Sequence, residues 1–474
     1  MIAQNNIRVR FAVLSTVLDN KVTLLYSVIM RYERIKQFNP WFDDPHYRFK
    51  ESGFKKRFIF PKIKKALSLK LILSISGLRR VGKTTILRQL ANELLAKKKT
   101  IFYYQFSDTD NDLAGLLKYY FEALSRKNVN IVKVFILLDE LQYVPDWQET
   151  LTFYYDLNRD IRFVITGSAS LYLHKNTKEG LAGRILDFKI YPLSFDEYLY
   201  LKSGVSFGGD IDAGLGVAGV ARELAAREKH LLLRRNEVYQ FLIQGEFAEI
   251  FNYSDYELVK NYLLLSVVDK IFSKDIRIFQ VEKLRELQAL YKALLQNSAQ
   301  AVSFLRLAED LAINRLTVKN YATVLDKSYL MAPVKNYLRS VRSQEKAFNK
   351  IFSLSVNLLC ADLGIRDVKE MPFQDFKGHI IENYVFNQLQ KIFKNVDEIF
   401  YFNKDKQEVD FVATSGGNII PIEVKTTAKL LKKDFSGLVG FLEKKHLTEG
   451  LVLYGGEAKT VKIGDKTIYL LNWV

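Results

Sequence analysis

The stretch LILSISGLRRVGKTTILRQL, residues 71–90, decides the fold of the first part of the chain. Its apolar run 71–75 predicts a buried parallel strand, and the apolar spacing after Thr84 predicts a helix. Between strand and helix stands the pattern G-x-x-x-x-G-K-[ST], which is typical of a loop that binds phosphate groups. The residues of this pattern are Gly77, Gly82, Lys83 and Thr84.

Phosphate binding depends on this arrangement of residue types. Glycines let backbone N–H groups turn inward around phosphates, and the start of a helix adds partial positive charge. We expect Lys83 to reach the β- and γ-phosphates of ATP and the Thr84 hydroxyl to ligate Mg²⁺. The alternative is a glycine-rich turn without a ligand. The full set that we expect at the nucleotide is Gly77, Arg79, Arg80, Val81, Gly82, Lys83, Thr84, Thr85 and Ser168.

A second motif, VFILLDE at 134–140, is an apolar strand that ends in two carboxylates. In nucleoside triphosphatases of this type the strand-end Asp holds Mg²⁺, and an adjacent Glu polarises the attacking water. Asp139 and Glu140 fit these roles, whereas a solvated turn is the alternative. A third strand, FVITGSAS, ends in Thr166, Gly167 and Ser168. The hydroxyls of Thr166 and Ser168 either sense the γ-phosphate or cap the next helix.

The length and charge of the chain limit the class of protein. At 474 residues, a prior of about three domains applies. The net charge of +17 favours a polyanionic partner such as nucleic acid, with DNA preferred, although a generally Lys-rich surface is the alternative. The single cysteine, Cys360, excludes an intrachain disulfide and any multi-cysteine metal site, and it favours a cytoplasmic location.

The N-terminal segment 11–30 is apolar, but Asp19 and Lys21 interrupt it. A run broken in this way is a poor transmembrane helix, and it lacks the small-residue cleavage site of a signal peptide. Either Met30 is the true start or the segment is a peripheral helix, so we predict no membrane role.

The order of apolar runs predicts an α/β architecture with five regions. Strands are expected at Leu71–Ser76, Thr100–Gln105, Val134–Asp139, Arg162–Thr166 and Arg184–Tyr191. Six glycines between Ser203 and Gly219 predict a flexible loop or linker. The predicted regions are an N-terminal extension (1–44), a P-loop domain (45–202), a glycine-rich linker with helices (203–299), a winged-helix-like domain (300–345) and a C-terminal domain (346–474) with one helix and several strands.

The motifs GLRRVGKTT, LLDELQYVPDWQETL, ITGSASLYL and LAGRILDFKIYPLSFDEYL resemble the AAA+-type ATPase core of a large family of archaeal and bacterial ATPases. The resemblance runs from about residue 34 onward and implies a P-loop NTPase sheet of the ASCE type. It also implies that Arg184 is an arginine finger toward a neighbouring subunit, which would require a homo-oligomer. Arg79 and Arg80 are typical of the family; they contact nucleotide, contact the neighbouring strand or stay solvated.

The segment 307–331 predicts a helix, a turn and a second helix. Asn314 is expected to cap the second helix, whose first turns present Thr317, Lys319 and Asn320 to the outside. These side chains suit contacts with a DNA groove or with phosphates. The pattern resembles a winged helix, and winged helices also serve as protein contacts and lids.

The C-terminal stretch EVDFVATSGGNIIPIEVK, residues 408–425, holds a second constellation. Glu423 and Lys425 are two apart and project from the same face of a strand, and a hairpin brings Asp410 beside them. Glu382, in the helical stretch GHIIENYVFNQL, supplies a further carboxylate. Three acids beside a lysine suggest a Mg²⁺ site for phosphodiester cleavage. The pattern D…E-x-K resembles the PD-(D/E)xK restriction-endonuclease-like fold, many members of which bind without cutting.

These observations predict an ATPase that couples nucleotide state to binding or processing of nucleic acid. The residues expected to act catalytically are Lys83, Asp139, Glu140, Arg184, Asp410, Glu423 and Lys425, and those expected at Mg²⁺ are Thr84, Asp139, Glu382, Asp410 and Glu423. One competing hypothesis is an ATP-dependent assembly switch whose C-terminal domain binds partners without cleavage, and a second is a defence-type or mobile-element nuclease that ATP gates.

Overall fold

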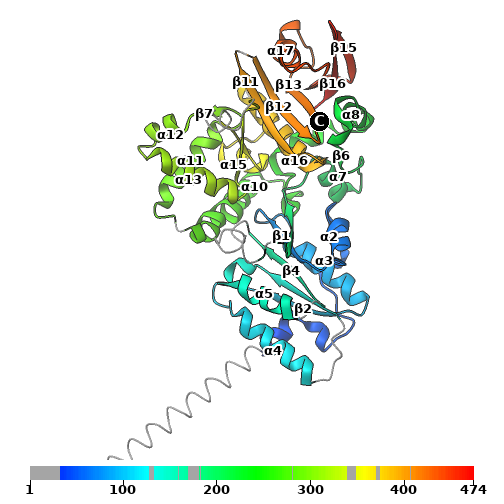
Figure 1. The fold of residues 1–474 in the computed structure, drawn as a ribbon, viewed down its shortest axis with the longest axis vertical. Helices are drawn as coiled ribbons and strands as arrows, with labels where there is room; N and C mark the ends of the chain where they lie inside the picture. The colour runs from blue at the N-terminus through cyan, green and yellow to red at the C-terminus, as the bar shows by residue number, and fades with distance from the viewer. Residues whose placement is uncertain are drawn as a thin grey trace, which may run out of the picture. The chain divides into compact units, whose positions relative to one another are not determined.

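The computed structural model describes residues 32–126, 133–157, 160–168, 181, 183–279, 281–338, 349–369, 374–405 and 407–473. The N-terminal segment 11–30 lies outside these residues. The chain forms two compact units (Figure 1). The first holds the described part of Met1–Ser76, Lys83–Gly167 and His174–Phe188, and the second holds Gly77–Gly82 and the described part of Ser168–Leu173 and Lys189–Val474.

The first unit is built on a five-stranded sheet in the order β2-β3-β4-β1-β5. The pairs β2–β3, β3–β4 and β4–β1 are parallel. Every residue of β1, β3 and β4 is buried, because helices cover the sheet and apolar runs of this kind suit a sheet without an exposed face. The strands are β1 (Ile72–Gly77), β2 (Thr100–Gln105), β3 (Val134–Asp139), β4 (Ile161–Gly167) and β5 (Ile185–Ile190).

These bounds confirm all five predicted strands to within one residue at each end. The helices of this unit are α2 (Phe60–Ala66), α3 (Lys83–Ala96), α4 (Leu113–Arg126) and α5 (Trp147–Leu157), and 3-10 turns occur at Pro40–Phe42, Lys50–Gly53 and Leu141–Tyr143. The helix α3, which follows the phosphate loop directly, packs on β2, β3 and β4. An α/β fold with a parallel central sheet is therefore confirmed.

Residues 32–44, which we assigned to an N-terminal extension, are part of this first unit. The fully buried Asn39 pairs with the backbone of Tyr103 on β2, since its Nδ2 donates to the Tyr103 carbonyl at 2.9 Å and its Oδ1 accepts from the Tyr103 N–H at 2.8 Å. The amide side chain thus satisfies β2 in the way that a neighbouring strand would. Ile35 and Trp41 are buried beside it.

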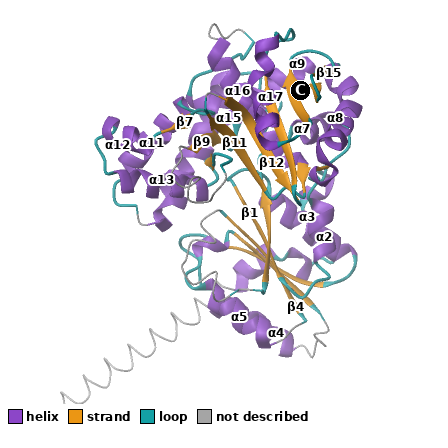
Figure 2. Ribbon diagram, turned by 45° about the horizontal axis from the view of Figure 1, so that its top comes forward, coloured by secondary structure: helices purple, strands orange, loops and turns teal. Residues whose placement is uncertain are grey.

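The second unit contains a six-stranded mixed sheet in the order β11-β12-β13-β14-β16-β15. The pairs β13–β14 and β14–β16 are parallel, and the other three are antiparallel. The helix α17 (Ser436–Lys445) packs on β12, and α8 (Gly216–Leu232) packs on β16 (Figure 2). The strands are β11 (Glu398–Lys404), β12 (Gln407–Ser415), β13 (Asn418–Val424), β14 (Glu449–Tyr454), β15 (Lys459–Ile463) and β16 (Lys466–Asn472).

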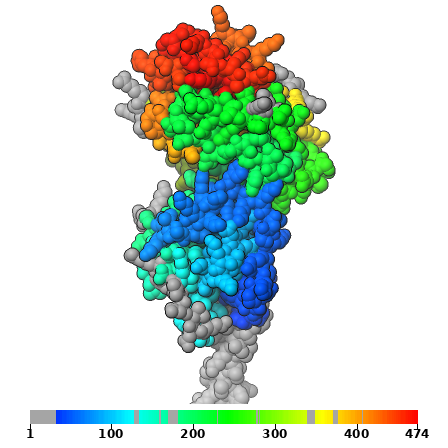
Figure 3. Space-filling view, turned by 90° about the vertical axis from the view of Figure 1, so that its right-hand side faces the viewer, coloured from blue at the N-terminus to red at the C-terminus, as the bar shows by residue number. Residues whose placement is uncertain are grey.

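The two helices lie on opposite faces of this sheet. Val452 of β14 packs into a cluster with Phe441 of α17, whereas the next residue, Leu453, lines a cavity together with Leu224 of α8. Consecutive side chains of a strand point to opposite faces, so the sheet is covered on both sides. Figure 3 shows the segment around α8, in green, directly against the red C-terminal strands.

The remaining elements of the second unit are mainly helical. A small sheet, β7-β9-β8, consists of β7 (Ala301–Val302), β8 (Met331–Val334) and β9 (Asn349–Ser353). The short strands β6 (Ile211–Asp212) and β10 (Phe393–Lys394) pair in parallel. The helices are α7 (Phe195–Ser203), α9 (Arg235–Gln244), α10 (Tyr256–Asn261), α11 (Leu284–Gln296), α12 (Phe304–Asp310), α13 (Arg315–Lys327), α15 (Val356–Asp362) and α16 (Gln374–Ile392), with π-helices at Tyr262–Val268 and Ile271–Asp275.

Two predictions about this unit are wrong. The glycine-rich stretch 203–219 is not a linker throughout, because Ile211 is fully buried in β6 and Gly216 is the first residue of α8. Among its described residues, the segment beyond residue 348 contains three α-helices, α15, α16 and α17, where one was expected. The predicted helix pair at 307–331 is confirmed as α12 and α13, and the Asn314 side chain caps α13 by accepting from the Leu316 N–H at 2.7 Å.

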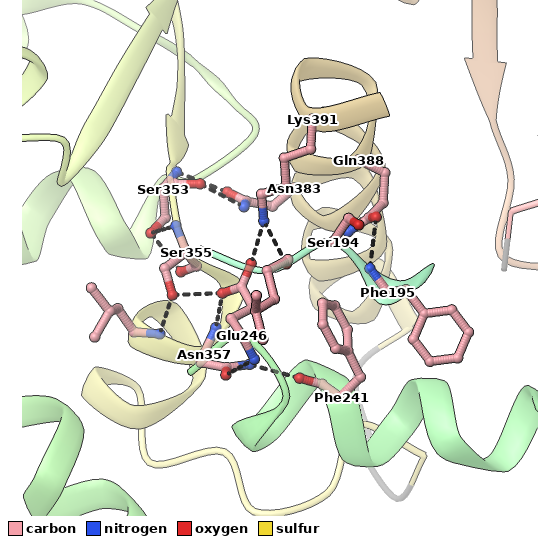
Figure 4. Close-up of polar contacts among 12 residues, drawn as sticks. Ser194, Phe195, Phe241, Glu246, Ser353, Ser355, Asn357, Asn383, Gln388 and Lys391 are labelled. Atoms are coloured by element: carbon pink, nitrogen blue, oxygen red, sulfur yellow. Dashed lines mark hydrogen bonds and ion pairs between the residues drawn. The ribbon is translucent and has the colours of Figure 1, made fainter. Parts of the chain in front are cut away.

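A network of buried polar groups joins four segments of the second unit (Figure 4). The fully buried carboxylate of Glu246 accepts from Lys391 Nζ of α16 at 2.8 Å and from the Ser355 hydroxyl at 2.6 Å. Its backbone N–H donates to Asn357 Oδ1 at 2.8 Å, and Asn357 in turn donates to carbonyls at the end of α9. Lys391 also donates to the Leu193 carbonyl at 3.1 Å.

Lys391→Met is expected to destabilise the second unit by about 3–5 kcal/mol, because it leaves the Glu246 carboxylate buried without its counter-charge. The measurement is urea unfolding of the full chain. The exposed Lys394→Met serves as the control and is expected to change the free energy of unfolding by less than about 0.5 kcal/mol. A Lys391→Met effect as small as that of the control would show that the pair does not hold the unit together.

Candidate nucleotide site and a C-terminal acidic cluster

The loop that follows β1 has the backbone that a phosphate loop needs. Gly77 has φ +150° and Gly82 has φ +93°, both in the region that favours glycine. A Cβ on Gly77 would stand 2.1 Å from the Ile190 carbonyl oxygen, so no other residue fits without a shift of the backbone. Lys83 then begins α3, and its side chain is buried.

The two arginines of the loop are held by acidic side chains of the helical region. Arg79 makes a two-point ion pair with Asp275, with Nε to Oδ2 at 2.7 Å and Nη2 to Oδ1 at 2.6 Å. Arg80, at φ +65°, pairs with Glu249 at 3.3 Å and lies over the ring of Tyr262. Contact of either arginine with a nucleotide stays a prediction.

Thr84 and Asp139 meet as the motif spacing predicts. The Thr84 hydroxyl lies 3.2 Å from Asp139 Oδ1, although the two residues are 55 positions apart in the chain. Asp139 is completely buried, and its Oδ1 also accepts from the Thr166 hydroxyl. Burial, together with the negative charge of Glu140, raises the pKa of Asp139. A hydroxyl and a carboxylate oxygen at this separation are the ligand types that Mg²⁺ prefers.

Glu140 stands at the end of β3 in a left-handed conformation, with φ +57° and ψ +42°. Its N–H donates to the Thr166 hydroxyl at 3.1 Å, and its carboxylate accepts from Gln142. Thr166 therefore contacts both acidic residues of the motif from β4. Ser168 follows β4 and is buried.

A supporting network behind Asp139 escaped sequence reasoning. The Tyr103 hydroxyl donates to Asp139 Oδ2 at 3.0 Å and lies 3.3 Å from Arg88 Nε. Arg88 pairs with the buried Glu51 at 3.0 Å. Tyr103 belongs to an apolar strand and Arg88 to a helix, so neither forms part of a recognisable motif. The network fixes the orientation of the Asp139 carboxylate from the side away from Thr84.

Arg184 lies far along the sheet from the phosphate loop of its own chain. Its carbonyl accepts from the N–H of Ile72, the first residue of β1, whereas the loop follows Gly77 at the other end of that strand. Five residues of strand span about 16 Å. The guanidinium pairs with Asp156 at 3.3 Å. A role of Arg184 toward the nucleotide site of a neighbouring subunit stays a prediction.

The C-terminal residues of the predicted second site converge in the second unit. Asp410 of β12 accepts from the Val424 N–H at 2.8 Å, and Lys425 Nζ lies 2.5 Å from Glu423 Oε1. Glu423 is buried, and its Oε2 has no hydrogen-bond partner. Burial raises the pKa of Glu423 to about 8, with Asp410 adding to the rise. Glu382 of α16 shows the same rise for the same reasons, also to about 8.

The structure differs from the predicted Mg²⁺ site because a lysine stands among these acids. Lys350 Nζ of β9 lies 2.9 Å from Glu382, 2.9 Å from Glu408 and 3.6 Å from Asp410. Burial would lower the pKa of Lys350, but the three carboxylates raise it overall. Within the described residues, no group of three or more His, Cys, Asp or Glu side chains can hold a metal ion. As placed, Glu382, Asp410 and Glu423 do not form such a group, and their role at Mg²⁺ stays a prediction.

Family models match three segments of the chain. Residues 70–199 match an AAA domain family. Residues 235–369 and 377–473 match two domains of unknown function, DUF8612 and DUF4143. The first match and the phosphate-loop geometry together support an ATP-binding protein of the AAA+ type.

The chain is similar to relatives over most of its length. The uncharacterized protein MJ1544 of Methanocaldococcus jannaschii is 28% identical over 368 residues, which is 74% of each chain. The uncharacterized protein MJ1637 of the same organism is 28% identical over 85% of this chain and 86% of its own. An uncharacterized protein of Haemophilus influenzae is 24% identical over 84% of this chain and 93% of its own.

Solved structures show only a distant likeness. AMPPCP-bound DnaA from Aquifex aeolicus has a TM-score of 0.26 and 16% identity, over 60% of this chain and 93% of its own. Drosophila ORC bound to AT-rich DNA and Cdc6 has a TM-score of 0.21 and 12% identity, over 65% of this chain and 90% of its own. In the part of the chain that is described, no helix is long and apolar enough to cross a membrane.

Proposed function

We propose that the protein hydrolyses ATP with Mg²⁺ and uses the nucleotide state to control binding of nucleic acid, with DNA as the favoured partner. The observation that carries the ATPase proposal is the approach of the Thr84 hydroxyl to Asp139 Oδ1 at 3.2 Å, with Glu140 next in the chain. Thr84 and Asp139 would hold Mg²⁺, which neutralises the charge of the phosphates, while Lys83 binds the β- and γ-phosphates.

Glu140 is the residue that we assign to the attacking water. Its carboxylate is tied to Gln142, and its backbone is fixed by Thr166, so the side chain is held at the end of β3. A carboxylate in this place orients water and accepts its proton as the bond to the γ-phosphate breaks. Thr166 contacts both acidic residues and would report the state of the γ-phosphate from β4, with Ser168 beyond it.

We propose that Arg184 completes the site of a neighbouring subunit in a homo-oligomer. Support comes from its distance from its own phosphate loop, since a guanidinium that stabilises transferred phosphate must come within hydrogen-bonding reach. Asp156, which pairs with Arg184 in the same chain, is half exposed. Exchange of this ion pair for a phosphate therefore costs little free energy.

The nucleic-acid proposal rests on the net charge of +17 and on α13. We assign α11, α12, α13 and the β7-β9-β8 sheet to a winged-helix-like region. The exposed start of α13 presents Arg315, Lys319 and Asn320, and helix N-termini favour phosphate.

We also propose that the C-terminal mixed sheet is a restriction-endonuclease-like module. Because Lys350, a lysine outside the D…E-x-K pattern, lies among its acids, we favour binding over cleavage.

Glu140→Gln is expected to retain ATP but to lower its turnover by about 100-fold or more, since the amide cannot take the proton of the water. The measurements are nucleotide binding by fluorescence and phosphate release under saturating ATP. The exposed Glu149→Gln on α5 is the matched control and should leave both values unchanged.

Equal turnover in Glu140→Gln and Glu149→Gln would remove Glu140 from the mechanism.

In the same assay, Arg184→Ala should lower ATP turnover without loss of nucleotide binding. If a mixture of the Arg184→Ala and Glu140→Gln proteins regains turnover, the arginine acts on the site of a neighbouring subunit. An Arg184→Ala protein with unchanged turnover at concentrations where the chain assembles would contradict the finger role.

Lys319→Ala is expected to weaken DNA binding and to lower the slope of log affinity against log salt by about one. The measurement is fluorescence anisotropy with duplex DNA over a series of salt concentrations. Lys65→Ala, an exposed lysine of α2, is the charge-matched control. Weak binding that does not respond to salt would instead favour a protein partner.

A further inference from the structure

Four acidic side chains gather around two lysines in the C-terminal part of the second unit. Glu382 comes from α16, Glu408 and Asp410 from β12, and Glu423 from β13. Lys350 contacts Glu382, and Lys425 contacts Glu423. Glu423 Oε2 is buried without a partner, although water would satisfy it at the surface. We call these four acids the acidic cluster.

Lys350 enters this cluster from β9, which belongs to a different sheet. Its side chain is only 4% exposed, and its ammonium contacts Glu382 and Glu408 at 2.9 Å each. Asp410 Oδ1 lies at 3.6 Å, and the Tyr401 ring lies beneath the ammonium at 5.6 Å. Burial of a lysine ammonium costs free energy because the charge leaves water, and several surrounding acceptors offset this cost.

The backbone of β9 is held against α16 close to Lys350. The Asn383 amide, next to Glu382, accepts from the Ser353 N–H at 2.8 Å and donates to the Ser353 carbonyl at 2.9 Å. This two-point contact sets the register of β9 against α16. Lys350 and Glu382 therefore meet because their neighbours are locked together, which separates this contact from a chance pairing of surface charges.

We propose that Lys350 is a built-in cation that takes the place of a divalent metal ion in the acidic cluster. A Mg²⁺ ion would need carboxylate oxygens at about 2.0–2.1 Å, and an ammonium among the same oxygens excludes it by charge and by volume. The cluster is then a metal-independent joint between β9 and the C-terminal sheet. Without the lysine charge, we expect the four acids, which include the unpartnered Glu423 Oε2, to rearrange and to take up a divalent ion.

The test is a Mn²⁺ titration of the full chain without nucleotide, followed by electron paramagnetic resonance. All variants carry Thr84→Ala, so that the nucleotide site does not contribute. With Lys350 present, no Mn²⁺ is expected at the cluster. Lys350→Met is expected to gain one Mn²⁺ per chain that Mg²⁺ displaces, Lys350→Arg to gain none, and Lys350→Met with Asp410→Asn to lose the gained site.

The proposal is overturned if the protein with Lys350 binds a Mn²⁺ ion that Asp410→Asn removes, or if folded Lys350→Met gains none. Circular dichroism shows whether Lys350→Met is folded. If Lys350→Met is unfolded, Mn²⁺ binding is compared between the Thr84→Ala protein and the same protein with Asp410→Asn. Equal Mn²⁺ binding by the two supports the proposal, and a Mn²⁺ site that is lost in Asp410→Asn contradicts it. The readout is metal binding, so failure of the ATPase proposal would leave this result unaffected.

Discussion

The ion pair between Glu246 and Lys391 is the constraint on which the second unit depends. A fully buried carboxylate is costly unless hydrogen bonds and a counter-charge surround it, and here a lysine, a serine and an asparagine do so. Because these partners lie on α15, on α16 and in the turn before α15, the carboxylate joins segments that are more than 100 residues apart in the chain. Asn383, eight residues before Lys391 on α16, extends the same frame to β9.

The contacts of Glu246, Lys391 and Asn383 explain why Lys350 lies among the acids of the C-terminal cluster. The helix α16 carries Lys391, Asn383 and Glu382, so the element that anchors the unit also presents the first acid of the cluster. The strand β9 is tied to that helix, and Lys350 follows from its register. The first unit uses a comparable device at smaller scale, in which Tyr103 and Thr166 hold Asp139 for Thr84. In both units, buried polar contacts place the charged groups, and apolar packing supports them.

Sequence reasoning succeeded where the determining pattern is local. The strands of the first unit are apolar runs that the sequence predicts, and the structure brings the Thr84 hydroxyl to 3.2 Å from Asp139 Oδ1, while the roles of both residues at Mg²⁺ stay predictions. Sequence reasoning failed where contacts between residues far apart in the chain determine the structure. The stretch 203–219 reads as a linker because of its glycines, yet Ile211 is buried in a strand pair with β10. Lys350 has no local signal, since its partners lie 32, 58 and 60 residues further along the chain.

We propose that the nucleotide site hydrolyses ATP and that the acidic cluster, which contains Lys350, does not cleave phosphodiester bonds. The most direct measurement incubates supercoiled plasmid with the full chain, Mg²⁺ and ATP, and follows phosphate release and plasmid topology in the same reaction. We predict that phosphate is released, faster with plasmid than without, while the plasmid stays supercoiled. Nicked or linear plasmid that disappears in Asp410→Asn would contradict the account.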